Sequence, residues 1–385
     1  MQEFSLSRFW KIFFLILSPI GVTALSIFIF RIDFKNDSNP YLLVGFCLAG
    51  IAILILAIID AYYGKFVIAE DKVYTKGIFN NKELYLDEIS GYREENKHII
   101  IETNALNRKQ IKISTYYGNT GDILLWLSYY YKNLDAELID IEKEEILNNP
   151  HFGWTEEERA QKLHLAQSIS TILNIVGFIV GVWLLFYPKP YQPLMFGALL
   201  IPLLVIGIIK YFKGLIKLNE KEKSAYPSLT LALILPALIL CIRGISDYNL
   251  IDSSSIILPS SILSLSILVF LLVNHKELEY HKAKDLFVVL IIYAILFGYS
   301  FGIIISLNGL LDKSAPQYYS STILSKRTSS GKYTSYYFEI DTWGKQNEPE
   351  EISISRQKYD SLEPGQVVTV ELKNGFFNMP WYHIK

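Results

Sequence analysis

The chain alternates between polar stretches and long apolar blocks, and seven blocks of about twenty residues carry almost no charge. A block of this length matches the thickness of a bilayer core. Because lipid offers no partner for backbone N–H and C=O groups, each block is expected to cross the membrane as an α-helix. The pattern therefore predicts an α-helical membrane protein with about seven transmembrane helices. The blocks cover residues 12–30, 41–60, 168–186, 192–209, 227–243, 255–273 and 286–308.

The Lys and Arg residues of the short connections predict how these helices are oriented. With the N-terminus in the cytoplasm, the cytoplasmic connections carry ten such residues and the opposite ones carry four. Cytoplasmic loops are enriched in Lys and Arg, so we expect a multi-pass protein of the cell membrane with a cytoplasmic N-terminus and an extracytoplasmic C-terminus. The first block is long for a signal peptide and is expected to remain as an uncleaved span. The ten residues are Arg8, Lys11, Lys210, Lys213, Lys217, Lys221, Lys223, Lys276, Lys282 and Lys284, and the four are Arg31, Lys35, Lys189 and Arg243.

Residues 64–134, between the second and third blocks, follow a different pattern. Six short segments alternate apolar and polar residues or are rich in β-branched residues, with turn residues between them, which predicts strands. They are "KFVIA", "KVYTKG", "KELYLDEI", "GYREEN", "HIIIET" and "KQIKIS". A helical spacing of apolar residues follows, with Asn119 or Thr120 as the candidate cap. Those apolar residues are Ile123, Leu124, Trp126, Leu127 and Tyr130.

A meander of about six strands closed by one helix resembles a bacterial pleckstrin-homology-like (PH-like) domain. The resemblance is carried by "FVIAEDKVYTKGIF", "LYLDEISGY", "IKIS" and the helix of Trp126, and it covers under a fifth of the chain. It implies a PH-like α+β domain, which the orientation above places in the cytoplasm.

Residues 64–134 carry ten Lys or Arg and nine Asp or Glu, so the region is nearly neutral. Proteins that bind phosphoinositides need a basic cluster to neutralise several phosphates. Here Lys65, Lys72, Lys76 and Lys82 are interleaved with Glu70, Asp71, Glu83 and Asp87. Specific binding of lipid headgroups is therefore disfavoured. A protein contact through the sheet edge or through the face of Tyr129, Tyr130 and Tyr131 fits better.

Two further regions lie outside the blocks. Residues 135–167 begin with six carboxylates and one lysine, which predicts a solvated acidic helix or linker. Thr155 and Glu158 then form a capping box, and the helical pattern continues into the third block, so one long helix is expected to enter the membrane. Residues 312–385 predict a small all-β extracytoplasmic domain of about five strands. Its segment "KYDSLEPGQVVTVELKNG" looks like the strand–turn–strand pieces of small β-barrels.

The tail after residue 312 is rich in aromatic residues. They can form the domain core, an interfacial belt at the bilayer or a surface for ligands such as glycans, and core plus belt is favoured. They are Tyr318, Tyr319, Tyr333, Tyr336, Tyr337, Trp343, Phe376, Phe377, Trp381 and Tyr382.

No residue pattern nominates a catalytic, cofactor-binding or metal-binding site. The sequence has no GxGxxG, Walker-type, GxSxG or CxxC motif. His275, Glu279 and His281 are close in sequence but lack the spacing of a helical zinc motif, and ordinary surface residues are favoured. Cys47 and Cys241 are expected to be small buried hydrophobic residues. The formal net charge of −2 gives no attraction for nucleic acid.

No predicted span carries an ionisable residue in its middle, where such a group usually marks an ion path or catalysis. Asp60, Arg243 and Asp285 lie at the edges. Asn174 and the four serines of the sixth block are expected to bond locally or to pack closely. Gly177-x-x-x-Gly181 and Gly298-x-x-x-Gly302 permit close helix approach, and packing within the chain is favoured over a dimer seam. The serines are Ser260, Ser261, Ser264 and Ser266.

The expected organisation is two transmembrane helices (1–63), a PH-like domain (64–134), a linker and entering helix (135–167), five transmembrane helices (168–311) and a β-domain (312–385). With one soluble domain on each face of the bilayer, the sequence favours a non-enzymatic scaffold or sensor-like protein with protein partners for both domains. The alternative is a transporter or channel for a neutral or apolar molecule, through the serine-rich sixth span. A membrane enzyme that uses loop residues stays open, without a nominated site.

Overall fold

The computed structural model describes residues 1–385 except 33, 35–38, 79–80, 105–108, 218–222, 274–282 and 331–333. The chain divides into two compact units. Unit 1 comprises Met1–Glu142 with Lys223–Ala225, and unit 2 comprises Lys143–Glu222 with Tyr226–Lys385. Each unit has its own hydrophobic cores.

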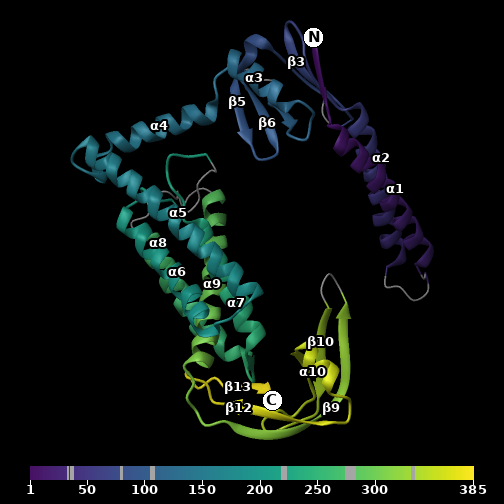
Figure 1. Cartoon of the computed structure of the whole chain (residues 1–385), viewed down its shortest axis with the longest axis vertical. Coiled ribbons are helices and arrows are strands. Elements are labelled where there is room, and N and C mark those ends of the chain that lie inside the picture. Colours follow the sequence, from purple (N-terminus) through teal and green to yellow (C-terminus); the bar gives the residue numbers. More distant parts are fainter. Residues whose placement is uncertain are drawn as a thin grey trace. The chain divides into compact units, whose positions relative to one another are not determined.

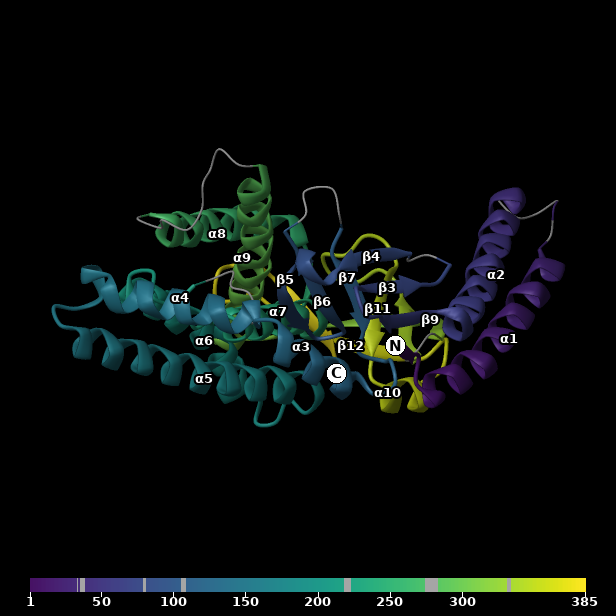
Figure 2. The same cartoon turned by 90° about the horizontal axis from the view of Figure 1, so that it is seen from above.

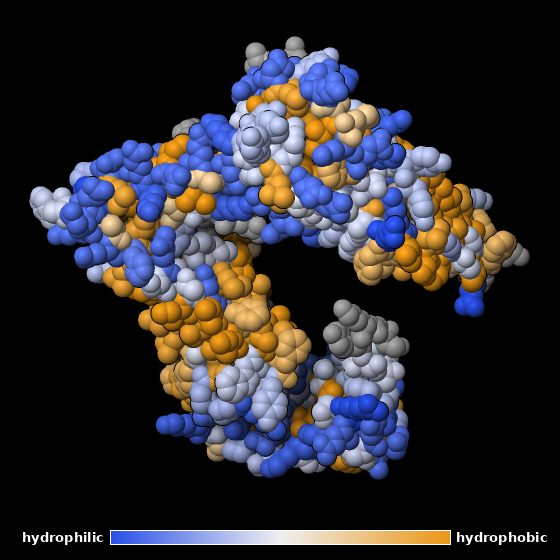
Figure 3. Space-filling model, turned by 45° about the horizontal axis from the view of Figure 1, so that its top comes forward, coloured by the Kyte–Doolittle hydropathy of each residue, from blue (hydrophilic) through white to orange (hydrophobic). Residues whose placement is uncertain are grey.

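Seven helices among the described residues are long and apolar enough to cross a membrane, as the pattern predicts. Apolar surface gathers over these helices, and hydrophilic surface covers most of the β-sheet regions (Figure 3). The chain thus has the make-up of a multi-pass α-helical membrane protein with β-sheet modules. The helices are α1 (Arg8–Arg31), α2 (Pro40–Tyr63), α5 (Glu156–Phe186), α6 (Tyr191–Phe212), α7 (Thr230–Asp247), α8 (Ile257–Leu272, after the 3₁₀ turn Ser253–Ile256) and α9 (Ala283–Leu310).

In unit 1, α1 and α2 lie side by side as a hairpin (Figures 1 and 2). A strand that the sequence analysis did not predict, β1 (Gln2–Ser5), precedes α1 and pairs antiparallel with β2 (Lys65–Ile68), which follows α2. Phe4 of β1 is buried in the same core as Phe66. Residues 1–63 thus hold a strand in addition to the two expected membrane helices, and the apolar side chain of Phe4 completes the core of the β-module.

The six predicted strand segments of 64–134 each form a strand, and β1 adds a seventh. The strands make a four-stranded sheet, β1-β2-β3-β4, and a three-stranded sheet, β5-β6-β7. Alternate side chains of both sheets pack into one core with Ile123 and Leu127. We refer to these two sheets and α3 as the first β-module. Its other elements are β3 (Lys72–Lys76), β4 (Lys82–Tyr85), β5 (Ile89–Glu95), β6 (His98–Thr103), β7 (Ile111–Ser114) and α3 (Thr120–Tyr130).

The helix predicted after β7 is present as α3, and its apolar face is narrower than the spacing suggested. Ile123 and Leu127 are fully buried, and Trp126 is half-buried against the core. Tyr130 is 62% exposed, because it is the last residue of α3. Tyr131 turns inward, and its hydroxyl donates a hydrogen bond to the Leu86 carbonyl at 3.0 Å. The exposed large hydrophobic residues of α3 are therefore Leu125, Tyr129 and Tyr130.

The acidic segment after this module forms a helix, α4 (Leu134–Asn148), as one of its two expected forms. In unit 2, α5 runs without a break over Glu156–Phe186, which confirms the single long helix. The Thr155 hydroxyl accepts the Glu158 N–H at 3.2 Å, and the Glu158 carboxylate accepts the Trp154 N–H at 2.8 Å. This is close to the predicted capping box, with the return bond one residue earlier.

Helix α7 is central to the bundle of unit 2 and packs against α5, α6 and α9. A Cβ atom on Gly177 or Gly181 of α5 would lie 2.9 or 2.8 Å from atoms of α7. A Cβ on Gly302 of α9 would lie 2.7 Å from the backbone nitrogen of Cys241 in α7. Both small-residue motifs therefore serve packing within the chain, as the analysis favoured.

The tail forms a six-stranded antiparallel sheet in the order β11-β10-β9-β12-β13-β8. We refer to it as the tail module. Its sixth strand, β8 (Asn249–Leu250), comes from the connection between α7 and α8 and pairs with β13. The short helix α10 (Arg356–Ser361) lies between β11 and β12, so the module is not purely β. The tail strands are β9 (Gln317–Ser330), β10 (Thr334–Ile340), β11 (Glu350–Ile354), β12 (Val367–Lys373) and β13 (Trp381–Ile384).

The tail module is fixed to the end of the bundle at which α5, α7 and α9 end (Figure 1). The buried Asn308 of α9 donates a side-chain hydrogen bond to the Met379 carbonyl at 2.8 Å and accepts the Phe377 N–H at 2.9 Å. Asp312 accepts the Trp381 indole N–H at 2.9 Å and the Gly375 N–H at 3.0 Å. These contacts hold the loop between β12 and β13 on the last turn of α9.

Candidate functional site

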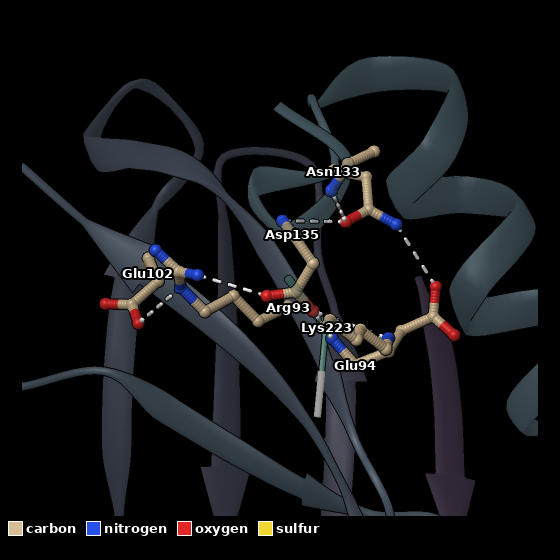
Figure 4. A network of polar contacts seen from close by, with 7 residues as sticks. Arg93, Glu94, Glu102, Asn133, Asp135 and Lys223 are labelled. Carbon is tan, nitrogen blue, oxygen red and sulfur yellow. Dashed lines mark hydrogen bonds and ion pairs between the residues drawn. The ribbon is translucent and has the colours of Figure 1, made fainter. Parts of the chain in front are cut away.

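The polar contacts that hold α4 on the first β-module meet at Asp135 (Figure 4). Asn133 begins this arrangement, because its side-chain oxygen accepts the N–H groups of Asp135 and Ala136 at 3.0 and 3.3 Å. That is the geometry of a helix N-cap, and it fixes where α4 starts. The Asn133 amide also donates to the Glu94 carboxylate at 3.3 Å.

The Asp135 carboxylate receives three donors, two from adjacent residues of β5 and one from the connection before α7. Arg93 Nη1 lies 3.0 Å from one oxygen. The Glu94 backbone N–H donates to the other oxygen at 3.0 Å, and Lys223 Nζ lies 3.4 Å from it. The side chain of Asp135 is only 11% exposed, so these interactions are weakly screened. We refer to Arg93, Glu94, Asn133, Asp135 and Lys223 as the junction.

A second carboxylate of α4 holds the same connection from Lys223 to Ala225. Glu142 accepts the Ser224 hydroxyl at 2.5 Å and the Ala225 N–H at 2.8 Å. In sequence, this connection precedes α7. The contacts hold Lys223–Ala225 on α4 and on the first β-module.

Glycine at position 91 permits the module and the start of α4 to approach closely. A Cβ atom at Gly91 would lie 2.7 Å from both the Lys132 carbonyl oxygen and Leu134 Cγ. The adjacent Tyr92 N–H donates to that carbonyl at 3.1 Å. The close contact places Asn133 and Asp135 beside β5.

The donors around Asp135 set its protonation. Burial raises the pKa of this carboxyl, but the Glu94 N–H, Arg93 and Lys223 outweigh that effect and hold the pKa below its usual value of 3.8. A group whose pKa is lowered by folding stabilises the fold above its unfolded pKa. The stabilisation by Asp135 is therefore complete at neutral pH and is lost as the pH falls below about 4.

We expect Asp135→Asn to loosen the junction by about 1–3 kcal/mol, the range for hydrogen bonds to charged groups. Hydrogen exchange of residues 91–95 and 133–137 in the full chain should become about tenfold faster or more. Asp140→Asn, at an exposed position on the same helix, should leave these rates unchanged. Equal exchange in Asp135→Asn and the wild type would show that the junction contributes nothing.

The four lysines weighed for lipid binding do not form a free basic cluster. Lys65 pairs with Glu3 at 2.7 Å, and Lys72 pairs with Glu83 at 3.0 Å. Lys82 donates to the Gln110 carbonyl at 3.0 Å. These contacts neutralise or occupy three of the four lysines.

Several polar groups within the spans make hydrogen bonds inside the bundle. Asn174 donates to the Ser228 carbonyl and accepts the Ala232 N–H, at 2.8 and 2.9 Å, so it caps the start of α7. Ser261, Ser264 and Ser266 of α8 bond back to their own helix, as expected. Arg243 donates to the Leu184 and Leu185 carbonyls at the end of α5.

Among the described residues, no group of three His, Cys, Asp or Glu side chains is placed to hold a metal ion. His275, Glu279 and His281 lie outside those residues, as does Tyr333. Cys47 is buried and Cys241 is half-buried, and both are free thiols.

Of the tail aromatics, Trp343 and Tyr382 lie in the core, whereas Phe376 and Phe377 are exposed beside the end of α9.

Sequence reasoning did not single out the junction. Arg93, Asp135 and Lys223 are ordinary charged residues in the sequence, and only the long-range pairing gives them a common place. The one local feature was Asn133 ahead of an acidic first turn, which is a typical start for a helix.

Comparison with known proteins gives no family for this chain: no protein-family model, curated protein or solved structure matches it.

Proposed function

We propose that this protein is a non-enzymatic membrane scaffold or sensor-like protein, whose two β-modules bind partners on opposite faces of the bilayer. One observation carries the proposal. Each module contains a strand that directly adjoins a membrane helix, β1 before α1 and β8 between α7 and α8. A partner bound to either module therefore acts on an element that is continuous with the helices.

The chain connectivity supports the assignment of the modules to two faces. The first module lies between α2 and α5, and the tail module follows α9, so five candidate spans separate them. An odd number of crossings changes sides. The distribution of Lys and Arg supports a cytoplasmic first module and N-terminus, with the tail module on the other side.

A PH-like identity for the first module belongs to the same proposal. Its four-stranded and three-stranded sheets, with α3 packed on their common core, support that class. Its paired lysines direct the proposal toward a protein partner. The exposed Leu125, Tyr129 and Tyr130 face of α3 is the surface we assign to that partner, because apolar side chains gathered outside a span mark contact sites.

The alternative of a transporter or channel rests on a different observation. The hydroxyl groups of Ser260, Ser300 and Ser306 are buried in the bundle with no hydrogen-bond partner among the described residues. A polar path through α8 and α9 would use such groups. Flux of neutral solutes into proteoliposomes that hold the pure protein would favour this function over the scaffold.

A photo-cross-linking amino acid at position 129 tests the scaffold. Tyr129 is 81% exposed, and we expect discrete protein adducts from this position in native membranes. The same group at Glu95, an exposed position of β5, should give none of these adducts. Identical adducts from both positions, or lipid adducts alone from position 129, would contradict a protein-binding face on α3.

A further inference from the structure

One face of the tail sheet gathers aromatic and charged side chains from three neighbouring strands. Tyr318 of β9, Glu371 of β12 and His383 of β13 lie directly opposite one another in the antiparallel register. Lys373 and Trp381 form a cross-strand pair two residues along. The residues between them, among them Val370, Leu372 and Tyr382, point to the other face and form the core. We refer to this outward group, together with Lys385, as the tail face.

The aromatic rings of the tail face lie next to one another and next to charged side chains. The rings of Trp381 and His383 have centroids 5.8 Å apart and planes only 22° apart. Tyr318 is 54% exposed. The ammonium of Lys385 lies 5.2 Å from the Tyr318 ring centroid, and that of Lys373 lies 5.6 Å from the Trp381 ring centroid. Cations thus flank the rings at both ends.

A carboxylate lies beneath these groups. Glu371 is only 8% exposed. Its oxygens contact His383 Nε2 at 3.7 Å, Lys385 Nζ at 3.8 Å and Lys373 Nζ at 4.0 Å. These contacts are ion pairs, and their distances are too long for hydrogen bonds. Such a carboxylate retains the capacity to accept hydrogen bonds from a ligand.

This combination of groups fits a sugar ring. A pyranose has an apolar face that stacks on aromatic rings, hydroxyls that donate to a carboxylate, and oxygens that accept from ammonium groups. Two lysines against one glutamate leave the face with positive charge, which favours a sugar that carries carboxylates over a neutral one. A lipid phosphate is less suited, because it accepts hydrogen bonds only and would meet the Glu371 carboxylate.

We propose that the tail face binds an acidic saccharide chain through Tyr318, Glu371, Lys373, Trp381, His383 and Lys385. The proposal names a partner for the tail module and so rests on the proposed function in that respect. It does not depend on the side of the membrane, because the binding surface lies within one module.

Binding of polygalacturonate to the purified full chain in lipid nanodiscs tests the proposal by calorimetry. We expect saturable binding that weakens about tenfold in Tyr318→Ala and in Lys385→Gln, as for the loss of one stacking or charged contact. Lys345→Gln, at an exposed position of the same module, should bind as the wild type does. Neutral dextran should bind at least about tenfold more weakly, and all variants should keep the wild-type melting temperature.

Three results would overturn this assignment. Wild-type affinity in both Tyr318→Ala and Lys385→Gln would remove the tail face from the binding site. Dextran sulfate that binds as tightly as polygalacturonate, with no effect of Tyr318→Ala, would reduce the face to a charged patch. Binding to vesicles with anionic lipid, without binding to polygalacturonate, would make it a lipid surface. None of these results alters the expected adducts at position 129, so the two proposals fail separately.

Discussion

Replacing Gly302 by leucine is expected to destabilise the helix bundle by more than about 3 kcal/mol, the upper end of the usual cost of overpacking. A Cβ atom at this position would lie 2.7 Å from the Cys241 nitrogen and 2.8 Å from the Leu240 carbonyl carbon. Both are backbone atoms of α7, so no side chain can rotate to make room. Helices α7 and α9 would have to move apart along the contact that joins α9 to the bundle.

Gly207→Leu provides the matched control. A Cβ at Gly207 of α6 meets no atom within 4 Å, so this substitution should change the stability by no more than about 0.5 kcal/mol. Unfolding of both variants by sodium dodecyl sulfate, followed by circular dichroism in mixed micelles, measures the difference. A loss below about 1 kcal/mol in Gly302→Leu would mean that α7 and α9 are not in backbone contact.

Arg243→Met is expected to destabilise the same bundle by about 3–5 kcal/mol, the cost of removing one partner of a buried ion pair. Arg243 donates to the Leu184 carbonyl at 2.8 Å and to the Leu185 carbonyl at 2.9 Å, which closes the end of α5. It also pairs with Asp247 at 3.4 Å, and the side chains are 18% and 24% exposed. Methionine would leave the carboxylate and the two carbonyls without this donor.

Two further variants separate these contributions. Arg243→Met combined with Asp247→Leu removes the orphaned charge and should recover part of the lost stability, although the Tyr191 hydroxyl then loses its acceptor. Arg31→Met, at an exposed position in the last turn of α1, should have little effect. Tryptophan fluorescence during thermal unfolding reports the change, since Trp183 directly precedes Leu184 in α5. Equal stability of Arg243→Met and Arg31→Met would contradict a structural role for the arginine.

The membrane helices could be predicted from the sequence because the length and composition of each apolar block indicate a membrane helix without reference to distant residues. The strands of 65–114 could be predicted for the same reason, since their alternation is confined to short segments. β1 and β8 could not, because "QEFS" and "NL" are too short for a pattern and exist only through pairing with β2 and β13. The junction depends on the same kind of long-range contact, and so does the tail face, which combines residues of three strands with Lys385.

The exposure of Tyr130 shows the limit of a helical-wheel argument. Tyr130 has the spacing of Ile123 and Leu127, but it stands at the last position of α3 and reaches beyond the core. The helical spacing predicted the direction of the Tyr130 side chain. It carried no information on where the two sheets beneath α3 end. The PH-like class of the module remains a proposal for a related reason, since the resemblance rests on the order of strands and not on a motif.

Labelling of single cysteines tests the two-sided arrangement most directly. In a chain with Cys47 and Cys241 replaced by alanine, one cysteine is introduced at Glu70 of the first module or at Lys345 of the tail module, both exposed positions. A membrane-impermeant maleimide applied to intact cells should label the cysteine at 345 and spare the one at 70, and both should react after permeabilisation. Labelling of both positions in intact cells, or of neither, would place the two modules on one side and contradict the scaffold across the bilayer.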